Sequence, residues 1–508
     1  MATHTDPKRE EQQIESGGIY PTVSARSDGA YTDKKGGGSD VDVIGTFADI
    51  DEGYDPVFVK KTIRKVDLRL IPILSAMYFV SLCDRSNLGQ ARAANDQAMQ
   101  RDLKLSEGNN RYGMITLMFF IPYILLEIPS QLGLRRFGAR WWLGFACIAW
   151  GLVELGMGFV NSWTELMGLR VVLGAFEACL YPGAAYLIST WFPRKQISTR
   201  LAFFYTSSMV LSGLGATLSF GISQMHGMHG KSGWRWIFIM YGIITVAVGI
   251  LAVAFLVDFP DRATFLTEEQ KEFIHTRINR DRGDAVADKM TWHKFLQYMA
   301  DVKLWVFAFM FCTSAMGMYS LAYFLPRILS SIGFSNVLSQ LLMAPPYLWL
   351  IFPSFSSAWI SDRVKNMRAI MIVVNALCVI TGTLMYSQLP THQKAARYVG
   401  VFLANGGVNT NVSLSIGWAQ ASIRAQSKRG FTSALIVAWG GIGGIISSVA
   451  FYEKDAPGYP TGVWLTIAMH ILVIAFCGGL VLWFKFQNRR ADRGTVVLEH
   501  AEDFRYQI

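Results

Sequence analysis

Six ionisable side chains stand inside long apolar runs in the first half of the sequence: Asp84, Arg85, Glu127, Glu154, Arg170 and Glu177. An ionised group in hydrocarbon costs a few kcal/mol or more, so such residues persist only where they have a partner or a function. A guanidinium suits a carboxylate, because its planar fork donates two parallel hydrogen bonds. A carboxyl group held away from water can take up and release a proton near neutral pH. These residue types therefore indicate anion binding and proton carriage.

The spacing of two of these residues places them on one helix face. Arg170 and Glu177 are seven residues apart, which is two helical turns or about 10.5 Å. We expect Arg85 to attract a substrate carboxylate, Glu177 and Asp84 to carry protons, and Arg170 to take part in an outer gate. In the alternative interpretation, Asp84–Arg170 or Arg85–Glu177 are fixed ion pairs that hold the helices together.

The two remaining acids differ in what the sequence says of them. Glu127 stands near the end of its apolar run, directly before Ile128-Pro129-Ser130. We expect it to serve gating or helix packing rather than proton carriage. Glu154 is a buried acid to which the sequence assigns no role.

Aromatic and amide side chains in the second half could determine substrate selectivity. Tyr319 and Tyr323 are four residues apart and therefore share a helix face. Asn405 and Asn409 have the same spacing, and Trp418 supplies a ring in the same run. We expect these five residues to bind substrate. The alternative is ordinary helix packing with hydrogen bonds between helices.

The elements that position these residues are membrane-spanning helices. The chain of 508 residues is 52% hydrophobic and 17% charged, whereas soluble domains carry roughly 25% charged residues. Apolar runs of about 20 residues recur, each long enough to cross a bilayer core of about 30 Å. Twelve such runs predict an all-α membrane protein: 67–91, 112–134, 141–161, 165–190, 200–223, 234–257, 303–326, 338–360, 369–388, 397–421, 431–452 and 462–485.

A long polar segment divides the twelve spans into two sets of six. We expect a disordered tail over 1–58, a six-helix bundle over 59–257, a linker over 258–302, a second bundle over 303–486 and a tail over 487–508. The linker contains Thr267-Glu268-Glu269-Gln270, which predicts the start of an amphipathic helix. Such pseudo-repeats place the substrate site between the halves, with alternating access by rocking.

Basic residues indicate the orientation in the membrane. They cluster before the first span and in alternate loops thereafter, with the loop after the first span as an exception. By the positive-inside rule both termini are cytoplasmic. The net charge of +10 consists of these short clusters, which argues against nucleic acid as a partner.

The sequence predicts neither a cofactor nor a metal. The six cysteines stand singly in apolar runs and no histidine cluster accompanies them, so we expect packing roles. The glycine-rich stretch over 440–444 lies inside a predicted span, where glycines allow close helix packing.

The loop after the eighth predicted span resembles a signature of the major facilitator superfamily. In it Asp362 and Arg363 follow Ser361 at the end of the span. In the corresponding loop after the second span, Arg135 stands where the superfamily usually has an acid. The resemblance implies the major facilitator fold, with Asp362 and Arg363 in a gating role.

Two further stretches are similar to the anion:cation symporter branch, especially fungal allantoate, nicotinate and pantothenate permeases. One is the tetrapeptide Asp84-Arg85-Ser86-Asn87, and the other runs from Arg170 to Ala178. The resemblance implies proton-coupling acids and an anion-binding arginine at these positions. More distant anion transporters carry an arginine in the seventh span, where this chain has Thr313 or a neighbour, and this favours a monocarboxylate.

The sequence thus predicts a plasma-membrane transporter that takes up a small organic anion with protons and acts as a monomer in the lipid bilayer. Two alternatives stay open: a proton-driven exporter of a metabolite or toxin, and a non-transporting nutrient sensor on the same fold. An enzyme is disfavoured, because the spans contain no nucleophile–base pair and no set of metal ligands.

Overall fold

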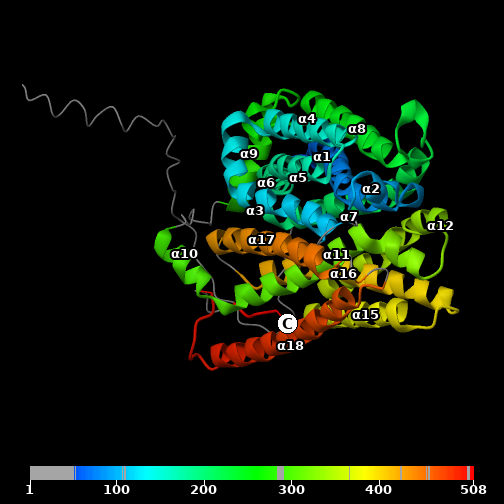
Figure 1. Cartoon of the computed structure of the whole chain (residues 1–508). Coiled ribbons are helices and arrows are strands. Elements are labelled where there is room, and N and C mark those ends of the chain that lie inside the picture. Colours follow the sequence, from blue (N-terminus) through cyan, green and yellow to red (C-terminus); the bar gives the residue numbers. More distant parts are fainter. Residues whose placement is uncertain are drawn as a thin grey trace, which may run out of the picture. The chain divides into compact units, whose positions relative to one another are not determined.

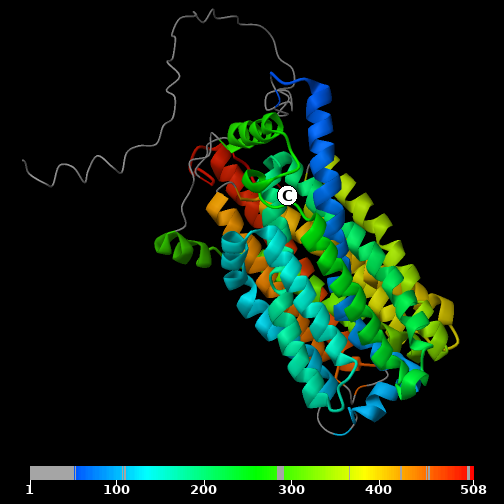
Figure 2. The same cartoon turned by 90° about the horizontal axis from the view of Figure 1, so that it is seen from above.

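Long helices joined by short loops make up most of the described chain (Figures 1 and 2). The structure is a computed structural model, and it describes residues 51–507 except 52, 106, 108–109, 283–290, 365, 424–425, 453–454, 456–457 and 500–503. Residues 1–50 of the tail predicted over 1–58 therefore lie outside the described residues.

The first half contains eight α-helices and two short 3-10 helices among the described residues. They are α1 (Pro56–Ala93), η1 (Asn95–Gln97), α2 (Ala98–Asp102), α3 (Arg111–Phe137), α4 (Ala139–Met157), α5 (Trp163–Glu177), α6 (Leu180–Trp191), α7 (Arg194–Ser223), η2 (Met228–Gly230) and α8 (Gly233–Phe255).

The linker and the second half follow the same pattern. The linker contains η3 (Pro260–Arg262), α9 (Glu268–Arg282) and α10 (Trp292–Met299). The second half contains α11 (Val302–Ser331), α12 (Asn336–Leu341), α13 (Ala344–Trp349), α14 (Ile351–Arg363), α15 (Arg368–Gln388), α16 (Lys394–Ala421), α17 (Gln426–Ala450) and α18 (Pro460–Asp492).

The predicted spans correspond to observed helices, and two of them are broken. The span predicted over 165–190 forms α5 and α6, which are separated directly after Glu177, and the span over 338–360 forms α12, α13 and α14. Prolines 345, 346 and 353 lie in that second span, and proline disrupts helical hydrogen bonding. Eight helical segments of the described part are long and apolar enough to cross a membrane, and they include the two broken ones as Trp163–Trp191 and Val337–Ser361.

Capping residues explain where several helices begin. The Asp55 carboxylate accepts hydrogen bonds from the backbone N–H groups of Val57 and Phe58 at the start of α1. At α9, the Thr267 hydroxyl accepts from the N–H of Gln270 and the Gln270 side chain accepts from the N–H of Thr267, at 3.3 Å each. This reciprocal capping box confirms the predicted helix start in the linker.

Several helix pairs join the two halves. α1 packs against α11, α3 against α17, and α7 against α12 and α13; α3 and α17 also lie side by side in Figure 1. Glycine permits the α1–α11 approach, because a Cβ added at Gly89 would lie 2.6 Å from the carbonyl oxygen of Tyr323. The seam between the halves is thus built on α1, α3, α7, α11 and α17.

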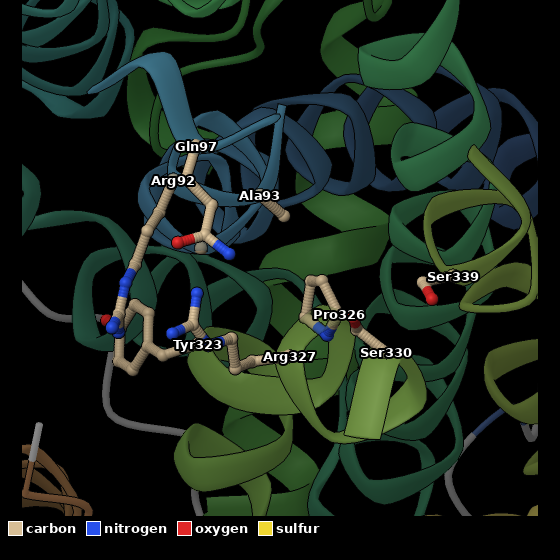
Figure 3. A pocket seen from close by; sticks show the side chains of 9 residues that line it. Arg92, Ala93, Gln97, Tyr323, Pro326, Arg327, Ser330 and Ser339 are labelled. Carbon is tan, nitrogen blue, oxygen red and sulfur yellow. The ribbon is translucent and has the colours of Figure 1, made fainter. Parts of the chain in front are cut away.

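Contacts between the two halves extend to one end of the seam. We call the end where α1 begins and α18 ends the terminal face, and the opposite end the distal face. Near the distal face, the Tyr112 hydroxyl donates to the carbonyl oxygen of Tyr323 at 3.4 Å, and the Arg92 guanidinium lies 4.1 Å from the Tyr112 ring centre. Figure 3 shows side chains that line a small cavity here, among them Arg92 of α1 and Arg327 of α11. The cavity has a volume of about 20 Å³, which is room for about one water molecule.

Candidate functional site

An ion pair between α1 and α5 forms the centre of the candidate site. The Nε of Arg85 donates to Oε1 of Glu177 at 2.5 Å, and the two residues are 5% and 0% exposed. Arg85–Glu177 is one of the two ion pairs of the alternative interpretation, and the structure contains it. A buried pair of this kind needs further hydrogen bonds to offset its loss of hydration.

Two hydroxyl groups supply those further bonds. The Ser81 hydroxyl, one turn before Arg85 on α1, donates to the same Oε1 of Glu177 at 2.5 Å. The Nη1 of Arg85 donates to the Tyr319 hydroxyl on α11 at 3.0 Å. The second of these bonds crosses the seam, so the pair in the first half is attached to the second half. The other carboxylate oxygen of Glu177, Oε2, has no hydrogen-bond partner within the described residues.

Aromatic rings of α3 and α11 surround the Arg85 guanidinium. Its central carbon lies 5.4 Å from the Phe119 ring centre and 4.8 Å from that of Tyr123, distances typical of cation–π contacts. Phe120 packs edge-on against Tyr319 with ring centres 4.9 Å apart. The rings of Tyr319 and Tyr323 are nearly parallel, with centres 6.2 Å apart. The two tyrosines predicted on one face of the seventh span are therefore part of the Arg85 environment.

Sequence reasoning missed the α3 aromatics and Ser81. The signal was present, because Phe119, Tyr123 and Glu127 recur every four residues and so share one face of α3. Glu127 is 6% exposed and within electrostatic reach of Arg85, and its Oε2 has no hydrogen-bond partner among the described residues. The structure thus places Glu127 with the central group, and the gating role predicted for it stays a prediction.

Asp84 points away from Arg85 into the first half. Its carboxylate accepts hydrogen bonds from the indole of Trp150 at 3.1 Å and from the hydroxyl of Thr245 at 3.1 Å. Successive residues of a helix are rotated by about 100°, so neighbours in sequence face different helices. On the same side, the Asn87 amide donates to Glu154 at 2.9 Å. Of these two neighbours only Arg85 therefore meets Glu177, and the proton-carrying role expected of Asp84 stays a prediction.

Arg170 is almost fully buried and its guanidinium has a free edge. It is 1% exposed, and its Nε and Nη2 have no hydrogen-bond partner within the described residues. Glu154 and Tyr323 both lie within electrostatic reach of its charge. Among the described residues, Asp84 and Arg170 do not form the ion pair that the alternative interpretation also named. Nε and Nη2 form the edge of a guanidinium that donates two parallel hydrogen bonds to one carboxylate.

The predicted ligands on α16 are occupied by packing interactions. The Asn405 amide donates to the carbonyl oxygen of Pro346 at 2.8 Å, and the Asn409 amide donates to the carbonyl oxygen of Asn405 at 2.9 Å. These contacts match the alternative interpretation, hydrogen bonds that hold helices together. Of the amide oxygens of Asn405 and Asn409, that of Asn409 has no hydrogen-bond partner within the described part of the chain.

Trp418 lies outside the Arg85 group. Its indole donates to the carbonyl oxygen of Gln507 at 2.8 Å, and its ring packs edge-on against Phe307 and Phe484. The tail after α18 therefore binds the indole N–H of a residue whose ring was expected to meet substrate. The reason is position along α16: Trp418 is one turn from the helix end at Ala421, on the terminal face.

The predicted gate residues after the eighth span end α14. The side chain of Asp362 lies outside the described residues. Arg363 is exposed, and its guanidinium lies 4.9 Å from the ring centre of Trp359. Their gating role stays a prediction.

Comparisons with known proteins agree with this architecture. The family model described as Major Facilitator Superfamily matches residues 74–448. The chain is 28% identical over 478 residues to "MFS transporter prlL" of Fungal sp. (strain NRRL 50135), which covers 91% of this chain and 96% of that protein. It is 27% identical over 445 residues to the "High-affinity nicotinic acid transporter" of Saccharomyces cerevisiae, covering 87% of this chain and 81% of that protein.

A solved structure supports the fold. The xylose transporter XylE from E. coli, in a partially occluded inward open conformation, matches with a TM-score of 0.62 at 12% identity, covering 82% of this chain and 99% of that chain. Identity at this level shows the fold alone. The family match extends over most of the chain, and the relatives are transporters. The chain therefore belongs to the major facilitator superfamily, and it is an integral membrane transporter and not an enzyme.

Proposed function

We propose that this protein takes up a small organic monocarboxylate together with protons, by alternating access between its two halves. The observation that carries the proposal is that Arg85 is shared between Glu177 in the first half and Tyr319 in the second. A rearrangement of this single guanidinium therefore changes contacts in both halves. Alternating access requires such a link, because the halves move relative to each other.

Charge balance links the anion to the proton. The Arg85–Glu177 pair is neutral, and a carboxylate that displaced Glu177 from Arg85 would leave an ionised acid buried beside it. Leaving such a charge uncompensated costs about 3–5 kcal/mol. Protonation of Glu177 removes that cost, so the anion binds most favourably when a proton arrives as well. Glu177 is the proposed coupling acid, and Asp84 is a second proton carrier held apart by Trp150 and Thr245.

The surroundings of Arg85 fit a flat monocarboxylate. Phe119, Tyr123 and Tyr319 provide ring surfaces within contact distance of the guanidinium or of one another. Arg170, seven residues before Glu177 in the sequence, has a free guanidinium edge as a second donor. Nicotinic acid, the compound in the name of one relative, is a planar aromatic monocarboxylate. We therefore propose an aromatic or similarly flat acid as the substrate class.

The orientation follows from the positive-inside rule. With both termini cytoplasmic, the terminal face is cytoplasmic and the distal face is extracellular. The protein resides in the plasma membrane, and the halves 59–257 and 303–486 rock about the seam during the cycle.

Uptake of radiolabelled nicotinate into cells or proteoliposomes tests the proposal. We expect faster uptake at acidic than at neutral external pH, and loss of accumulation with a protonophore. Arg85→Ala should abolish uptake, while Arg101→Ala, an exposed arginine of α2, should not. Protein-dependent depletion of internal carboxylate under an inward proton gradient would contradict import and favour the exporter.

A further inference from the structure

A groove opens on the first half, away from the Arg85 group. It has a volume of about 740 Å³ and lies where the start of α1 and α4 meets the end of α8. Its walls come from three regions: residues 68–73 of α1, residues 140–141 of α4, and residues 251–265 at and after the end of α8. These segments place it at the terminal face.

The polar wall of the groove carries more positive than negative charge. Arg69, Arg140 and Arg262 line it, against a single acid, Asp258. The Asp258 carboxylate already accepts hydrogen bonds from the backbone N–H groups of Ala139 and Phe259, at 2.9 Å each. Asp258 therefore caps α4, and its single charge does not neutralise all three arginines.

Two of the three arginines are available to a ligand. Arg140 is engaged, because its Nε and Nη2 donate to the carbonyl oxygens of Val253 and Ala254. Arg69 and Arg262 are exposed, and the guanidinium of Arg69 lies 4.8 Å from the ring centre of Phe265. The polar wall of the groove thus presents two guanidinium groups to an anion that binds there.

The other wall is apolar and faces outward. Leu68, Trp141 and Phe255 are 63%, 60% and 66% exposed, and Leu251 continues this surface along α8. Large apolar side chains exposed on a membrane protein face acyl chains, and tryptophan concentrates at the headgroup level. A ligand that fits both walls is an anion with an apolar chain attached.

We propose that this groove binds an anionic phospholipid of the leaflet at the terminal face, with its phosphate between Arg69 and Arg262 and an acyl chain along Leu251 and Phe255. Basic pockets between membrane helices on the cytoplasmic side suit such headgroups. The site does not involve the substrate residues, so it stands independently of the proposed transport activity.

Native mass spectrometry of the purified full-length protein tests the proposal. Phosphatidylinositol and phosphatidylcholine of the same acyl composition are added in equal amounts. We expect selective retention of phosphatidylinositol. The double variant Arg69→Gln/Arg262→Gln should bind it about twenty-five-fold more weakly, since each basic residue near an anionic surface contributes a factor of about five.

A matched control distinguishes a site from general surface charge. Arg136→Gln removes an exposed arginine at the end of α3, outside the groove, and should retain the preference. Equal binding of both lipids, an unchanged preference in the double variant, or an equal loss in the control would overturn the proposal. Displacement of the lipid by inorganic phosphate alone would identify a free-anion site and also overturn it. If the double variant does not fold, the single variants Arg69→Gln and Arg262→Gln supply the same comparison.

Discussion

The Nη1 of Arg85 donates a 3.0 Å hydrogen bond to the hydroxyl of Tyr319. The arginine belongs to the first half of the chain and the tyrosine to the second, and both are buried. The same guanidinium holds Glu177 through its Nε. A proton or an anion that rearranges the pair therefore changes a contact between the halves.

Tyr319→Phe removes this contact between the halves and little else. A hydrogen bond to a charged group contributes about 1.5–3 kcal/mol, so we expect the KM for the carboxylate to rise at least about ten-fold. Initial-rate uptake measures it. The control is Tyr347→Phe, a tyrosine of α13 at the α7 contact. An equal rise in KM in both variants would show a general effect of losing a hydroxyl in the seam.

Glu177→Gln should separate transport from the proton gradient. The amide stays neutral at every pH, so the protein should exchange carboxylate across the membrane without accumulating it, and uptake should lose its pH dependence. Counterflow and concentrative uptake in proteoliposomes distinguish the two activities. The control is Glu127→Gln, because Glu127 belongs to the same group but has no hydrogen bond to Arg85. Uptake by this variant should stay dependent on pH. Accumulation against the gradient by Glu177→Gln is incompatible with the coupling role.

Arg170→Met should raise stability and lower transport. The guanidinium is buried with two unpaired donors, and replacing buried charges by apolar groups of similar volume often stabilises a protein by about 1–4 kcal/mol. We expect a higher Tm of the substrate-free protein together with a large increase in KM. A lower Tm would show that Arg170 holds the fold, and an unchanged KM would remove it from the substrate site.

Gly89→Val should open the distal face. A Cβ at this position would meet the Tyr323 carbonyl oxygen at 2.6 Å, so α1 and α11 could not approach as they do. A cysteine placed at Ser339, which lines the small distal cavity, should then react faster with a membrane-impermeant maleimide from that side. Gly168→Val is the control, because nothing lies within 4 Å of a Cβ there. Unaltered labelling would argue that another contact closes the seam.

The tail after α18 should detach from Lys303 and Lys428 only at acidic pH. Burial raises the pKa of Glu499, but Lys303 and Lys428, at 2.5 and 2.9 Å, outweigh burial and hold the pKa below its ordinary value. A depressed pKa stabilises docking above the unfolded pKa, and this contribution disappears as the pH falls through the folded value. Hydrogen exchange of the tail should therefore rise only below the ordinary glutamate range. Glu499→Gln should show fast exchange at neutral pH; slow exchange there would contradict the ion-pair explanation.

The sequence by itself determined the fold class and the family. A long apolar run in lipid must form a helix, because only hydrogen bonds within the run can satisfy its backbone polar groups. This is a local property, so each run can be identified from its own residues. For the same reason the rare charges stood out, and the ion pair between Arg85 and Glu177 could be named as one of two alternatives. Thr267 and Gln270 likewise predicted the start of α9, because a capping box involves only neighbouring residues.

Only the tertiary structure decided how each helix is rotated against its neighbours. Asp84 and Arg85 are adjacent in sequence, yet the first contacts Trp150 and Thr245 and the second contacts Glu177 and Tyr319. Trp418 was grouped with Asn409 because they share a helix, but the folded tail reaches its indole first. Rotation and tail docking depend on side-chain packing between segments far apart in the chain, and the hydrophobic pattern of a single helix does not encode them.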